Sequence, residues 1–136
     1  MPWEITYLES INVVKTVYTE PVTLEELVNA AIATLKVAKE KDTHFFLGDC
    51  TELTENGSVL DIFKLGEFLE SLKADWNIKE AVIAPKTRKN VIEDLSFFET
   101  VTKNRDIKVR LFLDEDEALT WLTGQPSGKS LHEQNG

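Results

Sequence analysis

Short segments rich in β-branched and aromatic residues alternate along the chain with longer segments of helical periodicity. Two strand-like segments follow one another directly near the start, and a tight turn around 9–12 predicts that they form an antiparallel hairpin. The complete expected order is β-β-α-β-α-β-α-β-α. Parallel strands joined through helices require right-handed crossovers, so the pattern predicts a single-domain α/β fold with a mostly parallel sheet and one antiparallel edge strand. The expected strands cover 3–9, 11–19, 44–50, 78–85 and 107–113, and the expected helices cover 23–42, 59–75, 91–106 and 115–123.

Residues that favour helix N-termini mark where three of these helices begin. Thr23 and Glu26 have the spacing of a capping box, and Ser58 immediately precedes the second helix. Asp114 and Glu117 have the spacing of cap and N3 residue in the last helix. The apolar positions of the second helix include Leu60, Phe63, Phe68 and Leu72, and the inward positions of the third are Val91, Leu95, Phe98 and Val101 or Thr102.

Length and composition limit the class of protein. A chain of 136 residues can bury a core without metals or disulfides, and we expect one domain over 1–123, followed by a disordered tail over 124–136. The formal net charge of −9 argues against nucleic acid as a partner and against stable membrane association. A single cysteine, Cys50, and a start without the features of a signal peptide favour the cytoplasm.

The stretch from Phe97 to Leu122 carries a resemblance to a known family. It reads FFETVTKNRDIKVRLFLDEDEALTWL: an aromatic-bearing helix, a strand, an acidic turn and a short helix with a tryptophan. This ending resembles that of the SpoIIAA-like family, whose members are relatives of the STAS (sulfate transporter and anti-sigma antagonist) domain. The expected element order over 5–122 fits that resemblance as well. It implies a STAS-like α/β domain.

The same resemblance implies two kinds of activity. STAS domains that regulate sigma factors carry a phosphorylatable serine at the start of the helix after the third strand. The matching region here, GDCTELTENGSVLD, offers Ser58 but lacks the Asp-Ser pair before a glycine and has a longer loop, which argues against a phosphorylation switch. The lipid-binding CRAL-TRIO domains look like more distant relatives, and this implies a small ligand.

Polar residues follow the third and fourth strands of the chain, where both strands end. The carboxyl ends of parallel neighbours meet at one edge of a sheet, and this edge commonly binds ligands in open α/β folds. Helix N-termini after both loops add N–H groups suited to a phosphate, carboxylate or acyl head group. The alternative is that Ser58 is only a helix cap and 86–90 only an exposed turn. The candidate ligand-binding residues are Asp49, Cys50, Asn56, Gly57, Ser58, Lys86, Thr87 and Arg88.

No residue set in the chain predicts catalysis. Cys50 is a candidate nucleophile or, alternatively, a small buried apolar residue, and His44 is expected at the opposite end of the same strand. His132, the other histidine, falls in the expected tail. The acidic run 114–117 fits a helix N-terminus better than a metal site. We therefore predict no metal, no cofactor and no enzymatic activity.

Three functions remain, in order of preference. The first is a regulatory STAS-like module that binds a protein partner or forms a homodimer, for which the hairpin edge is available. The second is a protein that binds a small anionic or lipid ligand at the edge described above, with phenylalanines lining an apolar pocket beneath. The third is a thiol enzyme, which requires an exposed Cys50 sulfur and a base within hydrogen-bond reach.

Overall fold

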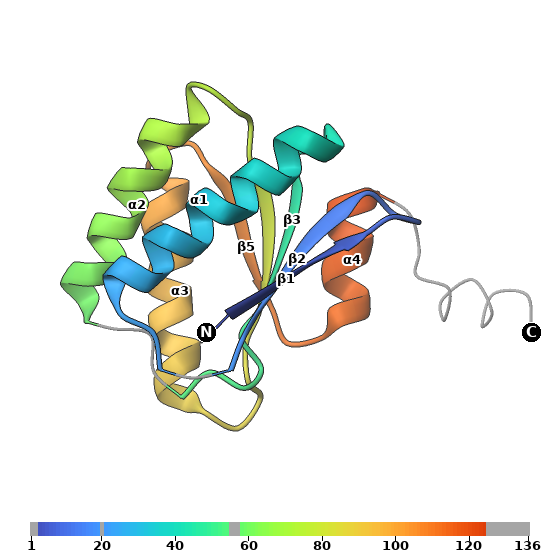
Figure 1. Ribbon diagram of the computed structural model, residues 1–136. Coiled ribbons are helices and arrows are strands. Elements are labelled where there is room, and N and C mark those ends of the chain that lie inside the picture. Colours follow the sequence, from blue (N-terminus) through green and yellow to red (C-terminus); the bar gives the residue numbers. More distant parts are fainter. Residues whose placement is uncertain (1–2, 20, 55–57, 125–136) are drawn as a thin grey trace, which may run out of the picture.

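The computed structural model describes residues 3–19, 21–54 and 58–124, and it contains the nine expected elements in the expected order. The α/β fold class is confirmed (Figure 1). The expected tail falls outside the described residues from 125 onward. The strands are β1 (Trp3–Leu8), β2 (Val13–Tyr18), β3 (Phe45–Asp49), β4 (Lys79–Ile83) and β5 (Lys108–Phe112), and the helices are α1 (Leu24–Lys41), α2 (Val59–Lys73), α3 (Lys89–Lys103) and α4 (Glu115–Thr123).

The strands form one sheet in the order β1-β2-β3-β4-β5. Only β1 and β2 are antiparallel, as predicted for the hairpin, and Asn12 in their turn has a φ of 57°. The other neighbours are parallel, with Phe46 of β3 opposite Val14 of β2 and Glu80 of β4. The carboxyl ends of β2 to β5 therefore share one edge of the sheet.

Helices α1, α2 and α3 cover one face of the sheet, and α4 lies on the other (Figure 1). From β2 to β5, each strand lies beside the one before it, and the sheet grows in one direction. Because every crossover is right-handed, all three connecting helices lie on the same face of the sheet. Among the described residues, the opposite face is covered only by α4, the short helix that follows β5. The result is a thick three-helix layer on one side and a thin cover on the other.

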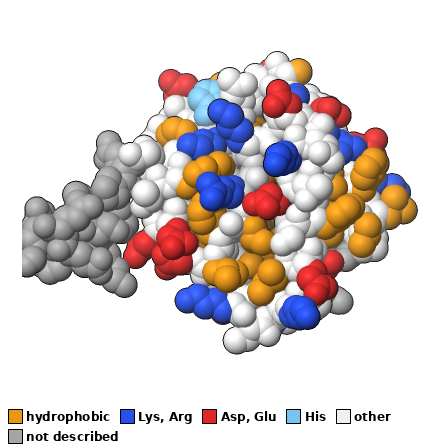
Figure 2. Space-filling view, turned by 180° about the vertical axis from the view of Figure 1, so that it is seen from behind, with side chains coloured by type: hydrophobic (Ala, Val, Ile, Leu, Met, Phe, Trp, Pro, Cys, Tyr) orange, Lys and Arg blue, Asp and Glu red, His pale blue; other side chains and the backbone are white. Residues whose placement is uncertain are grey.

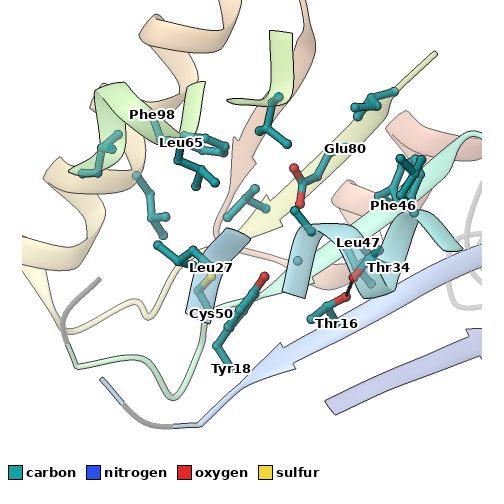
Figure 3. Close-up of a pocket in the computed structure, with 18 of the residues that line it drawn as sticks. Thr16, Tyr18, Leu27, Thr34, Phe46, Leu47, Cys50, Leu65, Glu80 and Phe98 are labelled. Carbon is teal, nitrogen blue, oxygen red and sulfur yellow. Dashed lines mark hydrogen bonds between the residues drawn. The ribbon is translucent and has the colours of Figure 1, made fainter. Parts of the chain in front are cut away.

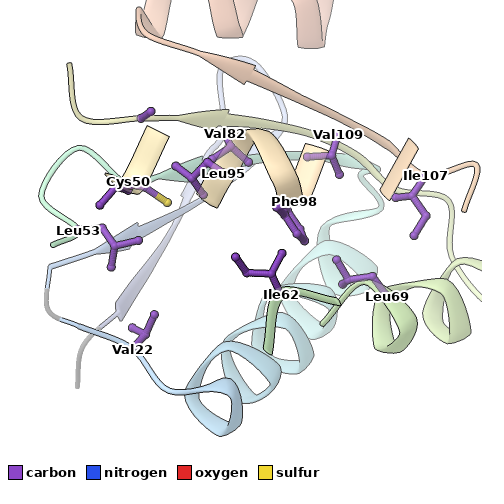
Figure 4. Close-up of a cluster of buried hydrophobic side chains, with 12 residues drawn as sticks. Val22, Cys50, Leu53, Ile62, Leu69, Val82, Leu95, Phe98, Ile107 and Val109 are labelled. Carbon is purple, nitrogen blue, oxygen red and sulfur yellow. The ribbon is translucent and has the colours of Figure 1, made fainter. Parts of the chain in front are cut away.

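The largest apolar cluster lies beneath the three-helix layer (Figure 4). Ile62 and Leu69 of α2 pack there with Leu95 and Phe98 of α3. Helices α2 and α3 approach closely at Gly66, where an added Cβ would lie only 2.3 Å from a Val101 methyl carbon. The predicted inward residues of α3 are confirmed as buried: Val91, Leu95, Phe98, Val101 and Thr102.

The apolar positions named for α2 do not all face the core. Leu60 and Phe63 are 59% and 42% exposed, whereas Ile62 is 1% exposed. The helix carries apolar residues on both sides, so helical spacing alone does not distinguish the two. Packing against α3 through Gly66 selects the side that contains Ile62 and Leu69.

The predicted caps are confirmed. The Thr23 hydroxyl accepts the Glu26 amide and the Glu26 carboxylate accepts the Thr23 amide, at 3.1 and 2.9 Å. Ser58 forms the same reciprocal arrangement with Asp61 at the start of α2. Asp114 accepts the Glu117 amide at 3.1 Å. These local hydrogen bonds fix the N-termini of α1, α2 and α4.

Two lysines hold α4 at its ends. Lys79 of β4 donates its Nζ to the carbonyls of Trp121 and Leu122 at 2.8 and 3.3 Å, where the C-terminal dipole of the helix favours a cation. Lys15 of β2 pairs with Glu115 in the first turn at 3.0 Å. Between them, the buried Ala118 and Leu122 pack on the sheet.

Candidate functional site

A cavity of about 100 Å³ lies between the sheet and the three-helix layer (Figure 3). Its walls come from strands β2, β3 and β4 and from helices α1, α2 and α3. The helices contribute only apolar residues and Thr34, whereas the strands add a few polar groups. The apolar lining is Leu27, Ala31, Leu35, Phe46, Leu47, Leu53, Ile62, Leu65, Leu69, Leu72, Ile78, Val82, Leu95 and Phe98.

The Glu80 carboxylate is the one carboxylate among the residues that line this cavity. In β4 the side chains alternate: Ala81 and Ile83 pack beneath α4, while Glu80 and Val82 point toward the three-helix layer. The space for the carboxylate depends on Gly48 of the adjacent strand, since a Cβ there would lie 3.1 Å from Glu80 Oε2. A half-buried acid is thus placed beside an otherwise apolar part of the core.

The Glu80 carboxylate has no hydrogen bond or ion pair within the residues that the structure describes. Burial penalises its charged form and raises the pKa of Glu80 from its ordinary 4.5 to about 7. Near neutral pH the group is therefore close to its midpoint. A carboxyl with these properties in a cavity is a recognised mark of a functional site.

Tyr18 and Cys50 stand at the carboxyl ends of β2 and β3 and also line the cavity. The Tyr18 hydroxyl points toward the same space as Glu80 (Figure 3). Burial raises the pKa of Tyr18 and the pKa of the Cys50 thiol, and the nearby negative charge of Glu80 raises both further. Both groups therefore keep their protons at neutral pH, and Glu80 is the member of the group that titrates there.

The polar lining is completed by a pair of hydroxyls. Thr16 of β2 and Thr34 of α1 lie 2.9 Å apart and share a hydrogen bond, drawn as a dashed line in Figure 3. Thr16 is 4% exposed. Each hydroxyl keeps acceptor capacity beyond the bond that it shares.

The arrangement does not meet the requirements for a thiol enzyme. Cys50 is 5% exposed, and the raised pKa of its thiol opposes formation of the nucleophilic thiolate. His44 lies at the other end of β3, as predicted, where its ring stacks on Trp76 at 4.2 Å between centroids. Its Nδ1 lies 2.8 Å from the Asn77 carbonyl oxygen. His44 and Cys50 therefore do not form a catalytic pair.

The predicted site residues after β3 separate into two groups. Asp49 and Cys50 are consecutive, so their side chains project to opposite faces of the sheet. Asp49 Oδ1 accepts the Thr51 amide and hydroxyl at 3.0 and 2.7 Å, and its other oxygen lies 3.8 Å from Lys15. Only Cys50 faces the cavity. Asn56 and Gly57 lie outside the described residues.

The two predicted loops do lie beside each other at the carboxyl edge. Arg88 Nη1 donates to the Leu53 carbonyl at 3.1 Å and so joins the loop before α3 to the loop after β3. Ser58 is used as the cap of α2, and Lys86 and Thr87 are exposed. The structure therefore brings the loops together, but Ser58 and Arg88 already have partners within the chain.

Glu80 is not among the site residues predicted from the sequence, although the sequence does contain a pattern that marks it as unusual. Ile78, Glu80 and Val82 share one face of a strand, and a lone acid between two apolar residues on a buried face is unusual.

The part of the chain described here contains no group of three or more His, Cys, Asp or Glu side chains that could hold a metal ion. Among the same residues, no helix has the length and apolar character needed to cross a bilayer.

Comparison of the chain with protein-family models, with curated proteins and with solved structures gives no match.

Proposed function

We propose that the protein binds a small, mainly apolar molecule in the cavity beneath the three-helix layer. The observation that carries this proposal is the cavity itself, which combines about 100 Å³ of space with a carboxylate that lacks a partner among the described residues. Protein interiors are normally packed with few voids larger than a water molecule. A space of this size beside an unpaired acid is costly for folding alone and is explained by a ligand that fills it.

The size of the cavity limits the ligand. An engineered cavity of about 150 Å³ in another protein holds benzene, so about 100 Å³ suits a molecule of roughly five non-hydrogen atoms. A long acyl chain needs more room than this. The proposal therefore keeps the small ligand predicted from the sequence, moves it from the loops to the cavity, and excludes a long-chain lipid in this conformation.

Native mass spectrometry of the protein purified from its own host tests the proposal. We expect a fixed added mass of about 100 Da or less, consistent with a ligand of roughly five non-hydrogen atoms, that is lost on denaturation. Ala31 lines the cavity, so Ala31→Leu should fill it and abolish the added mass. The same substitution at Ala33, which does not line the cavity, is the matched control. A protein that carries no ligand and binds none from a small-molecule panel would refute the proposal.

A second candidate function is self-association or binding of a protein partner, as the sequence predicted. Its specific support is an exposed apolar surface at the start of α2, where Val59 and Leu60 are each 59% exposed and Phe63 is 42% exposed. Sedimentation velocity of the wild type and of Leu60→Glu tests this function. A dimer that dissociates in the variant would support it, and a monomer in both would argue against a homodimer.

We further propose that the chain is a SpoIIAA-like, STAS-like protein of the cytoplasm. The element order and the placement of α4 support the resemblance, and the buried, unpaired Cys50 suits a reducing compartment. Basic and acidic side chains are interspersed on the face shown in Figure 2. Together with the net charge of −9, this supports a partner other than nucleic acid or an anionic membrane.

A further inference from the structure

We infer that the molecule bound in the cavity is a small alkyl amine, whose ammonium group pairs with the Glu80 carboxylate and whose hydrocarbon part fills the apolar space. This inference rests on the proposed function and adds the charge and head group of the ligand to it.

Glu80 faces the cavity without a positively charged partner among the described residues. Glu80 is half-buried, and its carboxylate faces an apolar cavity. A carboxylate with restricted access to water is normally paired with a positive charge, yet no described Lys or Arg forms an ion pair with Glu80. The lysines of neighbouring strands are used elsewhere: Lys15 pairs with Glu115, and Lys79 binds the carbonyls that end α4. The chain thus places an anion in the cavity and directs its own nearby cations to the opposite face of the sheet.

The hydrogen-bonding groups that line the cavity also suit an amine. An ammonium group has three donors and no acceptor. The cavity offers acceptors from three directions: the Glu80 carboxylate, the Tyr18 hydroxyl oxygen and the Thr16–Thr34 hydroxyl pair (Figure 3). The surrounding side chains are hydrocarbon and suit a short alkyl chain. The ammonium group of the ligand and its alkyl chain therefore both have complementary surroundings in the cavity.

Other head groups suit the cavity less well than an ammonium group. A ligand carboxylate would bring a second negative charge beside Glu80, and no described cation lines the cavity to offset it. An alcohol satisfies the hydrogen bonds but leaves the charge of the half-buried Glu80 unneutralised. The cavity therefore disfavours the acyl anion that the sequence suggested and favours a cation over a neutral molecule of equal size.

Amine binding should also depend on pH. Burial raises the pKa of Glu80 to about 7, so the carboxylate is mostly protonated at pH 6 and mostly ionised at pH 8. The other titratable groups that line the cavity are Tyr18 and Cys50, whose pKa values are raised further above neutral. Helices α1, α2 and α3 contribute no titratable or charged side chain to the lining. Affinity for an ammonium ion should therefore rise from pH 6 to pH 8.

The test is an NMR titration of the full chain with n-butylamine, n-butanol and butyrate, following the methyl signals of Leu27, Leu65 and Val82. These probes have similar alkyl chains and differ in head group. At pH 8 we expect the amine to bind at least about tenfold more tightly than the alcohol, since neutralising a buried charge is worth more than about 1.4 kcal/mol, and butyrate to bind most weakly. In Glu80→Gln the advantage of the amine should disappear, while the alcohol should bind as in the wild type.

The outcomes separate the inference from the proposed function. If the alcohol equals or exceeds the amine, or if Glu80→Gln leaves amine affinity unchanged, the amine assignment is wrong and the binding function stands. If none of the three probes shifts the lining methyl signals, the binding function itself is refuted. Should Glu80→Gln fail to fold, the pH series in the wild type decides instead: amine affinity that does not rise between pH 6 and pH 8 overturns the inference. Glu67→Gln, on the exposed side of α2, is the matched control.

Discussion

Replacing Glu80 with glutamine should change the pH dependence of stability in a defined way. Below about pH 4.5 the carboxyl is protonated in both the unfolded and the folded chain, so its ionisation contributes nothing to the free energy of unfolding. As the pH rises from there to about 7, the unfolded chain releases this proton while the folded chain retains it. The wild type therefore loses stability through this window, and above about pH 7 the loss is complete.

The size of the loss follows from the same pKa values. A rise of the pKa of Glu80 from 4.5 to about 7 corresponds to about 3 kcal/mol of destabilisation at pH 8, relative to a neutral side chain. Glu80→Gln keeps nearly the same shape and cannot ionise. We expect the free energy of unfolding of the variant, relative to the wild type, to increase by about 3 kcal/mol between pH 4 and pH 8.

Urea denaturation of both proteins at pH 4, 5, 6, 7 and 8 measures this difference directly, because the other titrating groups are common to both and cancel. Glu67→Gln, exposed on α2, should show little pH-dependent difference from the wild type. A difference between Glu80→Gln and the wild type that stays constant across the series would refute the reasoning, since it would mean that Glu80 is solvated or paired in the folded chain. A saturating alkyl amine should reduce the difference by stabilising the ionised wild type.

Three further changes test the packing of the fold by chemical denaturation. Gly66→Ala should destabilise by about 1–3 kcal/mol because its Cβ would overlap Val101, and Val101→Ala in the same chain should recover part of the loss; additive effects of the two changes would contradict this contact. Ser58→Ala should cost about 1 kcal/mol through the lost cap and leave ligand binding unchanged, so a loss of binding at constant stability would point to a direct role for Ser58. Lys79→Met should cost about 1–2 kcal/mol because the carbonyls that end α4 lose a charged donor; a neutral result would show that packing alone holds that helix.

Much of the fold follows from patterns that extend over several residues. The alternation of strand-like and helical segments determines the parallel sheet, and the caps at Thr23, Ser58 and Asp114 mark helix starts because each depends on residues within one turn. The inward side of α2 could not be predicted in this way. It depends on Gly66 meeting Val101, and these residues are brought together only by the packing of two helices.

The candidate site shows the same division. The adjacency of the loops after β3 and β4 follows from parallel strand order, and Arg88 does bond across them. An apolar pocket lined by phenylalanines was predicted beneath this edge, and Phe46 and Phe98 do line the cavity. Its volume could not be predicted, because that volume is what remains after side chains from six elements have packed. Glu80 and Gly48 become neighbours only through the pairing of β3 with β4.

The single short helix that covers one face of the sheet has a consequence for synthesis of the protein. Val13, Leu47, Ala81 and Ile83 form the surface on which Ala118 and Leu122 pack. During translation these strand residues are synthesised before α4, so the apolar face that they form has no covering helix until α4 has been made and has folded. Chains that stall before residue 115 would carry this surface permanently, and such nascent chains are the form of this protein that we expect to aggregate or to recruit chaperones.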